Sequence, residues 1–228
     1  MLRPQFVFSC LFLPLVLWCQ PEKDQRFAAF VYGGPSFSQI DGDYYFGYNK
    51  LGLRFGVGAN ILWKPKWYTS VGLGFNQTGA RPGRSEKYER GGASIDIRLN
   101  NIEVPVLLHY RLGKKDEYTK KANYRLYRSS EVQFGLALSR NTGRRIQRNG
   151  LQTQLARKED FAAVEDQFEA MDLHFIVGIT VQLGINTSLY LQHGKSILGI
   201  YRPEGGGLDD VLPLFPYYIN VGARYVLY

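Results

Sequence analysis

The sequence predicts an all-β fold, and specifically an eight-stranded antiparallel up-and-down transmembrane β-barrel. Three observations predict it. Apolar and polar residues alternate along segments of about ten residues, the length of a tilted strand that crosses a bilayer. Short and long connections alternate between these segments. The chain also ends on such a segment, Tyr217–Tyr228.

The last segment is the clearest of the expected strands. Odd positions from Tyr217 to Leu227 are apolar, whereas Asn220, Gly222 and Arg224 occupy the other face. In water such a strand would expose both an apolar face and a free edge. A closed barrel in a membrane removes the edge and places the apolar face in lipid.

The composition agrees with this fold. Of the 228 residues, 45% are hydrophobic, yet the mean hydropathy of −0.24 is too low for a bundle of membrane helices. The net charge of +8 lies mainly between the expected strands. Because no recognition helix or zinc-ligand spacing accompanies it, no nucleic-acid partner is predicted.

The N-terminus is typical of a secretory signal peptide. A basic residue precedes the apolar run Phe6–Trp18, which is too short to span a bilayer as a helix. We predict a signal peptide over residues 1–19 and a barrel domain over residues 20–228. A lipidated Cys19 is an alternative, which the bulky residue before it disfavours. Since Cys10 also lies in the signal, the mature chain would have no disulfide and no thiolate metal site.

The alternation places each strand and gives its phase. In the first half the expected strands are Phe27–Ser38, Leu51–Trp63, Trp67–Thr78 and Ile102–Leu112. In the second half they are Val132–Leu138, Leu173–Leu183, Thr187–Ile197 and Tyr217–Tyr228. An even count returns both chain ends to one side of the membrane.

The connections indicate which side is which. Residues 64–66 and 184–186 form short turns, as expected at the periplasmic end. The expected outer loops are long, over 39–48, 79–94, 140–170 and 198–215, with a short helix predicted in 160–171 from the spacing of its apolar residues.

Residues 113–130 break this rule, because they are long and highly charged on the expected periplasmic side. Either they extend the strands around a solvated turn, or Lys114–Lys121 is a docking element for a periplasmic partner.

Several stretches resemble a known family. These are Gly33-Gly-Pro-Ser-Phe-Ser38, Gly47-Tyr-Asn-Lys-Leu-Gly52, Phe75-Asn-Gln-Thr-Gly79 and Asn101-Ile-Glu-Val-Pro-Val-Leu-Leu-His-Tyr110. They are similar to the PorT-like outer-membrane β-barrel proteins typical of Bacteroidota.

That resemblance implies an integral protein of the outer membrane of a Gram-negative bacterium, in contact with outer-membrane lipid. Some members of the family support protein secretion, which implies a possible periplasmic or secretion-system partner. The ending Asn220-x-Gly-x-x-Tyr-x-Leu227 resembles the signal that the barrel assembly machinery reads.

Charged residues fall on the inward phase of the strands. The expected lumen network consists of Arg54, Glu103, His109, Arg111 and Arg224. A buried carboxylate needs a partner, so we expect Glu103 to pair with Arg54, Arg111 or Arg224. An eight-stranded barrel is narrow and filled by side chains, which favours a structural plug over a gate that passes ions.

The residues do not predict an enzyme. The three histidines lie on separate strands, with His193 expected to face lipid or an interface. No serine elbow, metal-binding helix or phosphate loop occurs, and no cofactor or metal is expected. Ser139 and Ser196 lie near loop ends, where a histidine would have to meet one of them to make a lipid hydrolase.

The remaining signal is a basic stretch in the third expected outer loop. Its cations are Arg140, Arg144, Arg145, Arg148, Arg157 and Lys158. They either keep a loop soluble or contact anionic lipid or an acidic ligand.

The sequence therefore predicts a non-enzymatic outer-membrane barrel for envelope interaction, binding or support of protein secretion. The first alternative is a small porin-like transport channel, and the second is an outer-membrane lipid-modifying enzyme.

Overall fold

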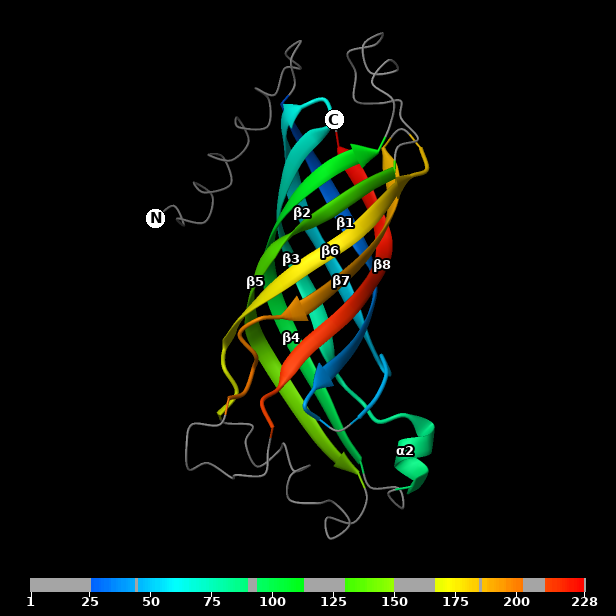
Figure 1. Ribbon diagram of the computed structural model, residues 1–228, viewed down its shortest axis with the longest axis vertical. Helices are drawn as coiled ribbons and strands as arrows, with labels where there is room; N and C mark the ends of the chain where they lie inside the picture. Colours follow the sequence, from blue (N-terminus) through cyan, green and yellow to red (C-terminus); the bar gives the residue numbers. More distant parts are fainter. Residues whose placement is uncertain are drawn as a thin grey trace, which may run out of the picture.

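The computed structural model describes residues 26–43, 45–89, 94–112, 130–149, 167–184, 186–202 and 212–227, and the predicted signal peptide lies outside them. Its strands are β1 (Phe27–Asp41), β2 (Lys50–Lys64), β3 (Trp67–Ala80), β4 (Ser94–Leu112), β5 (Ser130–Asn149), β6 (Met171–Gln182), β7 (Thr187–Ser196) and β8 (Phe215–Leu227). They form a closed barrel in sequence order, which confirms the predicted fold (Figure 1).

The terminal strand closes the barrel. β8 pairs antiparallel with β7 on one side and with β1 on the other, where Val31 lies opposite Tyr225 and Ser38 opposite Tyr218. All eight strands therefore have two neighbours over most of their length, and the edge that β8 would expose in water does not exist.

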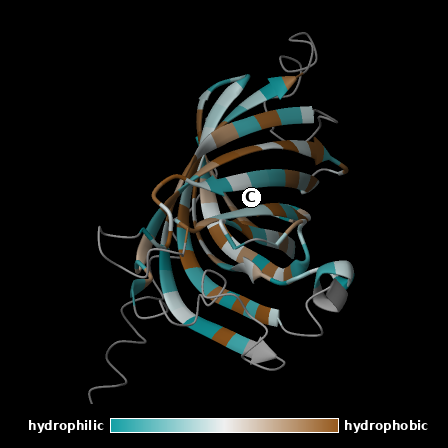
Figure 2. Ribbon diagram, turned by 60° about the horizontal axis from the view of Figure 1, so that its bottom comes forward, coloured by the Kyte–Doolittle hydropathy of each residue, from teal (hydrophilic) through white to brown (hydrophobic). Residues whose placement is uncertain are grey.

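Alternation separates an outer wall from an inner one. Leu53 is 60% exposed, whereas the next residue, Arg54, is 2% exposed. Apolar and polar positions accordingly alternate along the ribbons (Figure 2). The apolar wall faces lipid, because water would penalise so many exposed large apolar side chains.

The short connections define the periplasmic end. The turn at Pro65 and Lys66 joins β2 to β3, and residues 183–186 join β6 to β7. β1 begins and β8 ends at this same end, which is uppermost in Figure 1. The possible docking element Lys114–Lys121 lies outside the described residues.

Two strands are longer at the outer end than the sequence pattern indicates. β4 begins at Ser94 and β5 continues to Asn149, so they reach beyond the other strands in Figure 1. The prediction that residues 140–170 are all loop is therefore wrong for its first ten residues. We call the paired segments Ser94–Asn100 and Gly143–Asn149 the outer extension.

A single extra residue on β5 sets the phase of the outer extension. Asn101 lies opposite Asn141, but Asn100 lies opposite Gly143, so Thr142 is a β-bulge. The Thr142 hydroxyl donates a hydrogen bond to the carbonyl oxygen of Asn100 at 3.0 Å. Before the bulge, polar residues of β5 face the lumen and apolar residues face outward. Beyond it the arrangement is reversed, with Ile146 facing inward and Arg145 outward.

Most of the helix predicted over residues 160–171 lies outside the described residues, and only its C-terminal end can be compared with the structure. Met171 begins β6 rather than ending a helix, and residues 160–166 lie outside the described part of the chain. The helix that the structure describes is α2 (Arg84–Glu89), in the connection from β3 to β4. Among the described residues no helix has the length and hydropathy needed to span a membrane.

Inward glycines leave room for aromatic rings. A Cβ on Gly194 of β7 would collide with the ring of Tyr218 on β8, and a Cβ on Gly74 of β3 would collide with the hydroxyl of Tyr32 on β1. The small and large residues on neighbouring strands thus fill the narrow lumen together.

Candidate functional site: the lumen and the outer rim

An ion pair inside the lumen joins β2 and β4 across the intervening β3. The Nε atom of Arg54 donates to Oε1 of Glu103 at 2.6 Å, and both side chains are almost fully buried. The Nδ2 atom of Asn76 donates to the other carboxylate oxygen at 3.2 Å. Arg54 also donates to Gln192 and lies over the ring of Tyr32 at 5.1 Å. Of the three expected partners of Glu103, the structure selects Arg54.

The other two arginines have different partners. Arg111 donates from Nε to Oε1 of Glu131 at 3.1 Å, and the two residues lie directly opposite each other on β4 and β5. Arg111 is eight residues beyond Glu103 on β4, about 26 Å along the strand, so it does not reach that carboxylate. Arg224 donates to Asn60, and its guanidinium lies 3.8 Å from the ring centroid of Phe30.

Glu131 is the carboxylate that the sequence reasoning missed. Continuing the β5 alternation back from Val132 and Gln133 would have placed it on the inward phase. It accepts a hydrogen bond from the Tyr68 hydroxyl as well as from Arg111. His109 completes this periplasmic layer, with Nε2 2.7 Å from the Ser70 hydroxyl.

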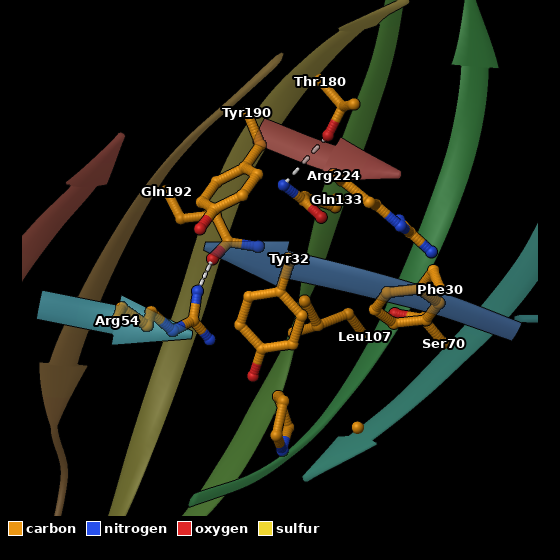
Figure 3. A pocket seen from close by; sticks show the side chains of 12 residues that line it. Phe30, Tyr32, Arg54, Ser70, Leu107, Gln133, Thr180, Tyr190, Gln192 and Arg224 are labelled. Carbon is orange, nitrogen blue, oxygen red and sulfur yellow. Dashed lines mark hydrogen bonds between the residues drawn. The ribbon is translucent and has the colours of Figure 1, made fainter. Parts of the chain in front are cut away.

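We call the Arg54–Glu103 pair and the periplasmic layer around Glu131 the charged layers. A small cavity lies between them (Figure 3). It has a volume of about 30 Å³, enough for about two waters at the 10–15 Å³ that each requires. Arg54, Gln192 and Tyr190 line one part of it, and Arg224 lies across from them. The cavity is a gap in a packed interior rather than a passage.

The outer end of the lumen is apolar. A cluster of nine buried residues, which we call the outer plug, closes it. Its members are Ile40, Ala80, Ile95, Ile97, Leu99, Phe168, Ile200, Tyr201 and Leu214. An apolar constriction without room for water is a barrier to ions. The outer plug, the Arg54–Glu103 pair and the periplasmic layer around Glu131 thus fill the barrel at three levels.

Next to the outer plug, a serine, an aspartate and a histidine meet. The Ser196 hydroxyl donates to Oδ1 of Asp172 at 2.8 Å, and Nε2 of His174 lies 2.9 Å from Oδ2 of the same carboxylate. A serine hydrolase needs its hydroxyl on the histidine, with the carboxylate behind. Here the carboxylate lies between the two, and Ser139 is opposite Asp172. The arrangement is that of a buried structural network.

A carboxylate also holds the loop between β1 and β2. Asp43 is fully buried, and its Oδ1 accepts hydrogen bonds from the Tyr45 amide at 2.9 Å and from Nε2 of Gln39 at 3.0 Å. Burial raises the pKa of Asp43 to about 7, although the bond from the Tyr45 amide opposes this. We therefore expect the stability of the loop to depend on pH near neutrality.

His193 lies outside the lumen. It is on the outward phase of β7, and its Nε2 is 3.2 Å from the hydroxyl of Tyr48. The Tyr48 ring packs edge-on against Tyr217 at 5.2 Å. The side chain thus belongs to an aromatic group on the outer surface.

The six predicted basic contacts of the outer rim do not all share one environment. Arg140, Arg144 and Arg145 lie on β5 instead of a loop. Arg140, Arg144 and Arg145 are all exposed, and Arg144 also donates from Nη1 to the Phe168 carbonyl oxygen at 3.1 Å. The backbone of Arg148 lies opposite Ile95; its side chain, together with Arg157 and Lys158, lies outside the described residues.

The sequence model of the outer membrane protein beta-barrel domain matches residues 14–195 of this chain. The chain belongs to the outer membrane protein beta-barrel domain family. Together with the lipid-facing wall and the closed ring of strands, this family places the protein in the outer membrane as an integral barrel. No curated protein matches the chain in sequence.

The chain is similar to several solved structures at low sequence identity. The Neisserial surface protein A has a TM-score of 0.44 and 10% identity, over 86% of this chain and 96% of that one. Ail of Yersinia pestis has a TM-score of 0.41 and 13% identity, over 88% and 100%. The N-terminal barrel of OprF from Pseudomonas aeruginosa has 0.40 and 8%, over 89% and 98%. Likeness at these identities concerns the fold alone.

Proposed function

We propose that this family member is a closed, non-enzymatic outer-membrane protein that acts through its surfaces, in envelope interaction or in support of protein secretion. The barrel is the anchor, and a partner binds at one of its two rims.

The closed lumen is the observation that carries this proposal. Arg54 on β2 pairs with Glu103 and also donates to Gln192 on β7, so its side chain reaches across the lumen. The outer plug fills the outer end with apolar side chains. A channel would need a continuous wet path, whereas the cavity on the periplasmic side of this pair has a volume of about 30 Å³ and a second one, next to the outer plug, has about 10 Å³. What remains for recognition is the outer extension and the periplasmic rim.

The chemistry near the outer plug supports the non-enzymatic part of the proposal. Ser196 donates its hydrogen bond to Asp172 and is 4% exposed. Its hydroxyl is therefore not poised on a base, and a lipid ester in the outer leaflet would not reach it.

A secretion role rests on the resemblance to PorT-like proteins of Bacteroidota. In this role a periplasmic or secretion-system component contacts the upper rim of Figure 1, where Leu112 ends β4 and is 51% exposed. The barrel assembly machinery is a further, transient partner that reads β8 during insertion.

Site-specific photo-crosslinking in native membranes tests the proposal. The crosslinker is placed at Leu112 on the periplasmic rim and at Gln147 on the outer extension. Leu53 on the lipid-facing wall is the control, because it is 60% exposed but faces acyl chains.

We expect a discrete, stoichiometric protein adduct from one rim position and none from Leu53. A secretion component at Leu112 selects the accessory role, and an envelope component at Gln147 selects outer-surface interaction. Absence of a protein adduct at both rims would contradict a function through partners, as would a steady ion current or lipid turnover by the purified protein.

A further inference from the structure

Two arginines face each other across the outer extension. Arg98 on β4 and Arg145 on β5 are directly opposite in the strand register, and both side chains are exposed. Like charges directly opposite in a sheet repel and destabilise it. In the described part of the chain, neither guanidinium makes an ion pair or a hydrogen bond. The pair therefore lacks a counter-charge of its own.

The carboxylate nearest in sequence is already occupied. Asp96 lies on the same face of β4 as Arg98, but it accepts the ammonium group of Lys50 and lies 3.7 Å from Nε of Arg81. One carboxylate thus serves two other cations. Cationic side chains therefore outnumber carboxylates in this region, and an anion from outside the protein would balance the charge of the two arginines.

The β-bulge at Thr142 creates this arrangement. Without the extra residue, the register that holds up to Asn141 would place Arg145 opposite Ile97, which belongs to the outer plug. With it, Ile146 lies opposite Ile97 and packs against the outer plug, and Arg145 turns to the outer face. The bulge aims the arginine away from the core.

The pair lies just above the lipid-facing wall. On β4 and β5 the outermost exposed large apolar residues are Ile102 and Leu138, with 45% and 47% of their surface exposed. Arg98 is four residues beyond Ile102, which is about 10 Å along the membrane normal for a tilted strand. The exposed Arg140, directly opposite Ile102, lies at the boundary itself. Outer-leaflet headgroups occupy this zone.

We propose that Arg98 and Arg145, with Arg140 below them, bind the phosphate group of an outer-leaflet lipid. Each guanidinium presents a planar fork of donors that matches phosphate oxygens. The acyl chains of the same molecule would lie along Ile102 and Leu138. This lipid site is independent of the closed lumen and of the secretion role proposed above.

Native mass spectrometry of the full barrel in detergent tests this assignment. The probe is bisphosphorylated lipid A, and the comparison ligands are the same glycolipid without phosphates and inorganic phosphate. The test variant is Arg98→Gln with Arg145→Gln. The matched control is Arg84→Gln with Arg202→Gln, which removes two exposed outer-side charges elsewhere. Heat-dependent gel mobility verifies that each variant is folded.

The test variant should bind bisphosphorylated lipid A about thirty-fold more weakly, equivalent to about 2 kcal/mol for two arginines near a membrane surface. The control variant should stay within threefold of the wild type. A loss below threefold in the test variant, an equal loss in the control, or equal binding of the phosphate-free glycolipid would overturn the proposal. If equimolar inorganic phosphate displaced the lipid A completely, free phosphate and not a lipid would be the ligand of this site.

The melting temperature gives a second readout. The sign of the difference between Arg98→Gln and the wild type, with and without lipid A, distinguishes a lipid site from a purely structural role. In phosphate-free detergent, Arg98→Gln should raise the melting temperature, because it removes the repulsion from Arg145. With saturating bisphosphorylated lipid A, the order should reverse, since the wild type gains more from the ligand. The same order in both conditions would contradict the site.

Discussion

The buried ion pair between β2 and β4 makes a quantitative prediction about stability. Replacing Glu103 by leucine leaves the Arg54 guanidinium, which is 2% exposed, without a carboxylate. Removing one partner of a buried pair costs about 3–5 kcal/mol, and Arg54→Leu should cost a similar amount. The double variant replaces both charges by apolar groups, so its cost should be within about 2 kcal/mol of zero.

The free energy of unfolding is measured for the wild type, the two single variants and the double variant. Each barrel is unfolded by guanidinium chloride in phospholipid vesicles and followed by tryptophan fluorescence. The double variant should be more stable than either single variant, with a coupling energy of at least about 3 kcal/mol. If the two single costs simply add, the pair is not a coupled element of the lumen, and the reasoning from burial and distance is refuted.

Two further predictions concern the outer loop and the packing of the lumen. Because burial raises the pKa of Asp43 to about 7 from 3.8, its contribution to loop stability is complete below about pH 4. That contribution, up to about 4 kcal/mol, is lost as the pH rises to about 7. Hydrogen exchange at the Tyr45 amide, corrected for the intrinsic rate, should show this loss of stability as the pH rises. The pH dependence should disappear in Asp43→Asn. If that variant keeps the pH dependence of the wild type, the assignment to Asp43 is refuted. Separately, Gly194→Val should destabilise the barrel by about 1–3 kcal/mol or more through collision with the Tyr218 ring. Gly184→Val, where no atom lies within 4 Å of a Cβ, should be near neutral in the same unfolding assay, and equal effects would exclude the collision as the cause.

The fold was predictable from sequence because alternation reports directly on the two walls of a barrel. Each lipid-facing position must be apolar, and each lumen position must be small, polar or paired, so the period of two survives in every strand that crosses the membrane. Leu51–Trp63 shows this most clearly, and β2 extends one residue past it at each end.

The pattern fails where the membrane ends. In the outer extension, Ile95, Ile97 and Leu99 are fully or nearly buried. The residues opposite Ile95 and Leu99 on β5 are the arginines Arg148 and Arg144, which look like loop residues in a sequence. The β-bulge at Thr142 also changes the phase in mid-strand. The local sequence does not indicate this extra residue, because the bulge depends on how β5 pairs with β4.

The lumen network was predictable as a set of inward charges but not as a set of pairs. Which cation reaches Glu103 depends on strand stagger around the barrel, and this is a property of the closed ring. Glu131 was missed because it precedes the apolar part of its strand. The outer plug was also missed, because Ile200, Tyr201 and Leu214 lie outside the long strands and join it only through the fold.

Ion current through single barrels in a planar lipid bilayer tests the central claim, that the lumen is closed. We expect no sustained conductance for the wild type across a wide voltage range, because the charged layers and the outer plug both block the path. A steady, ohmic current that scales with the number of inserted barrels would contradict it.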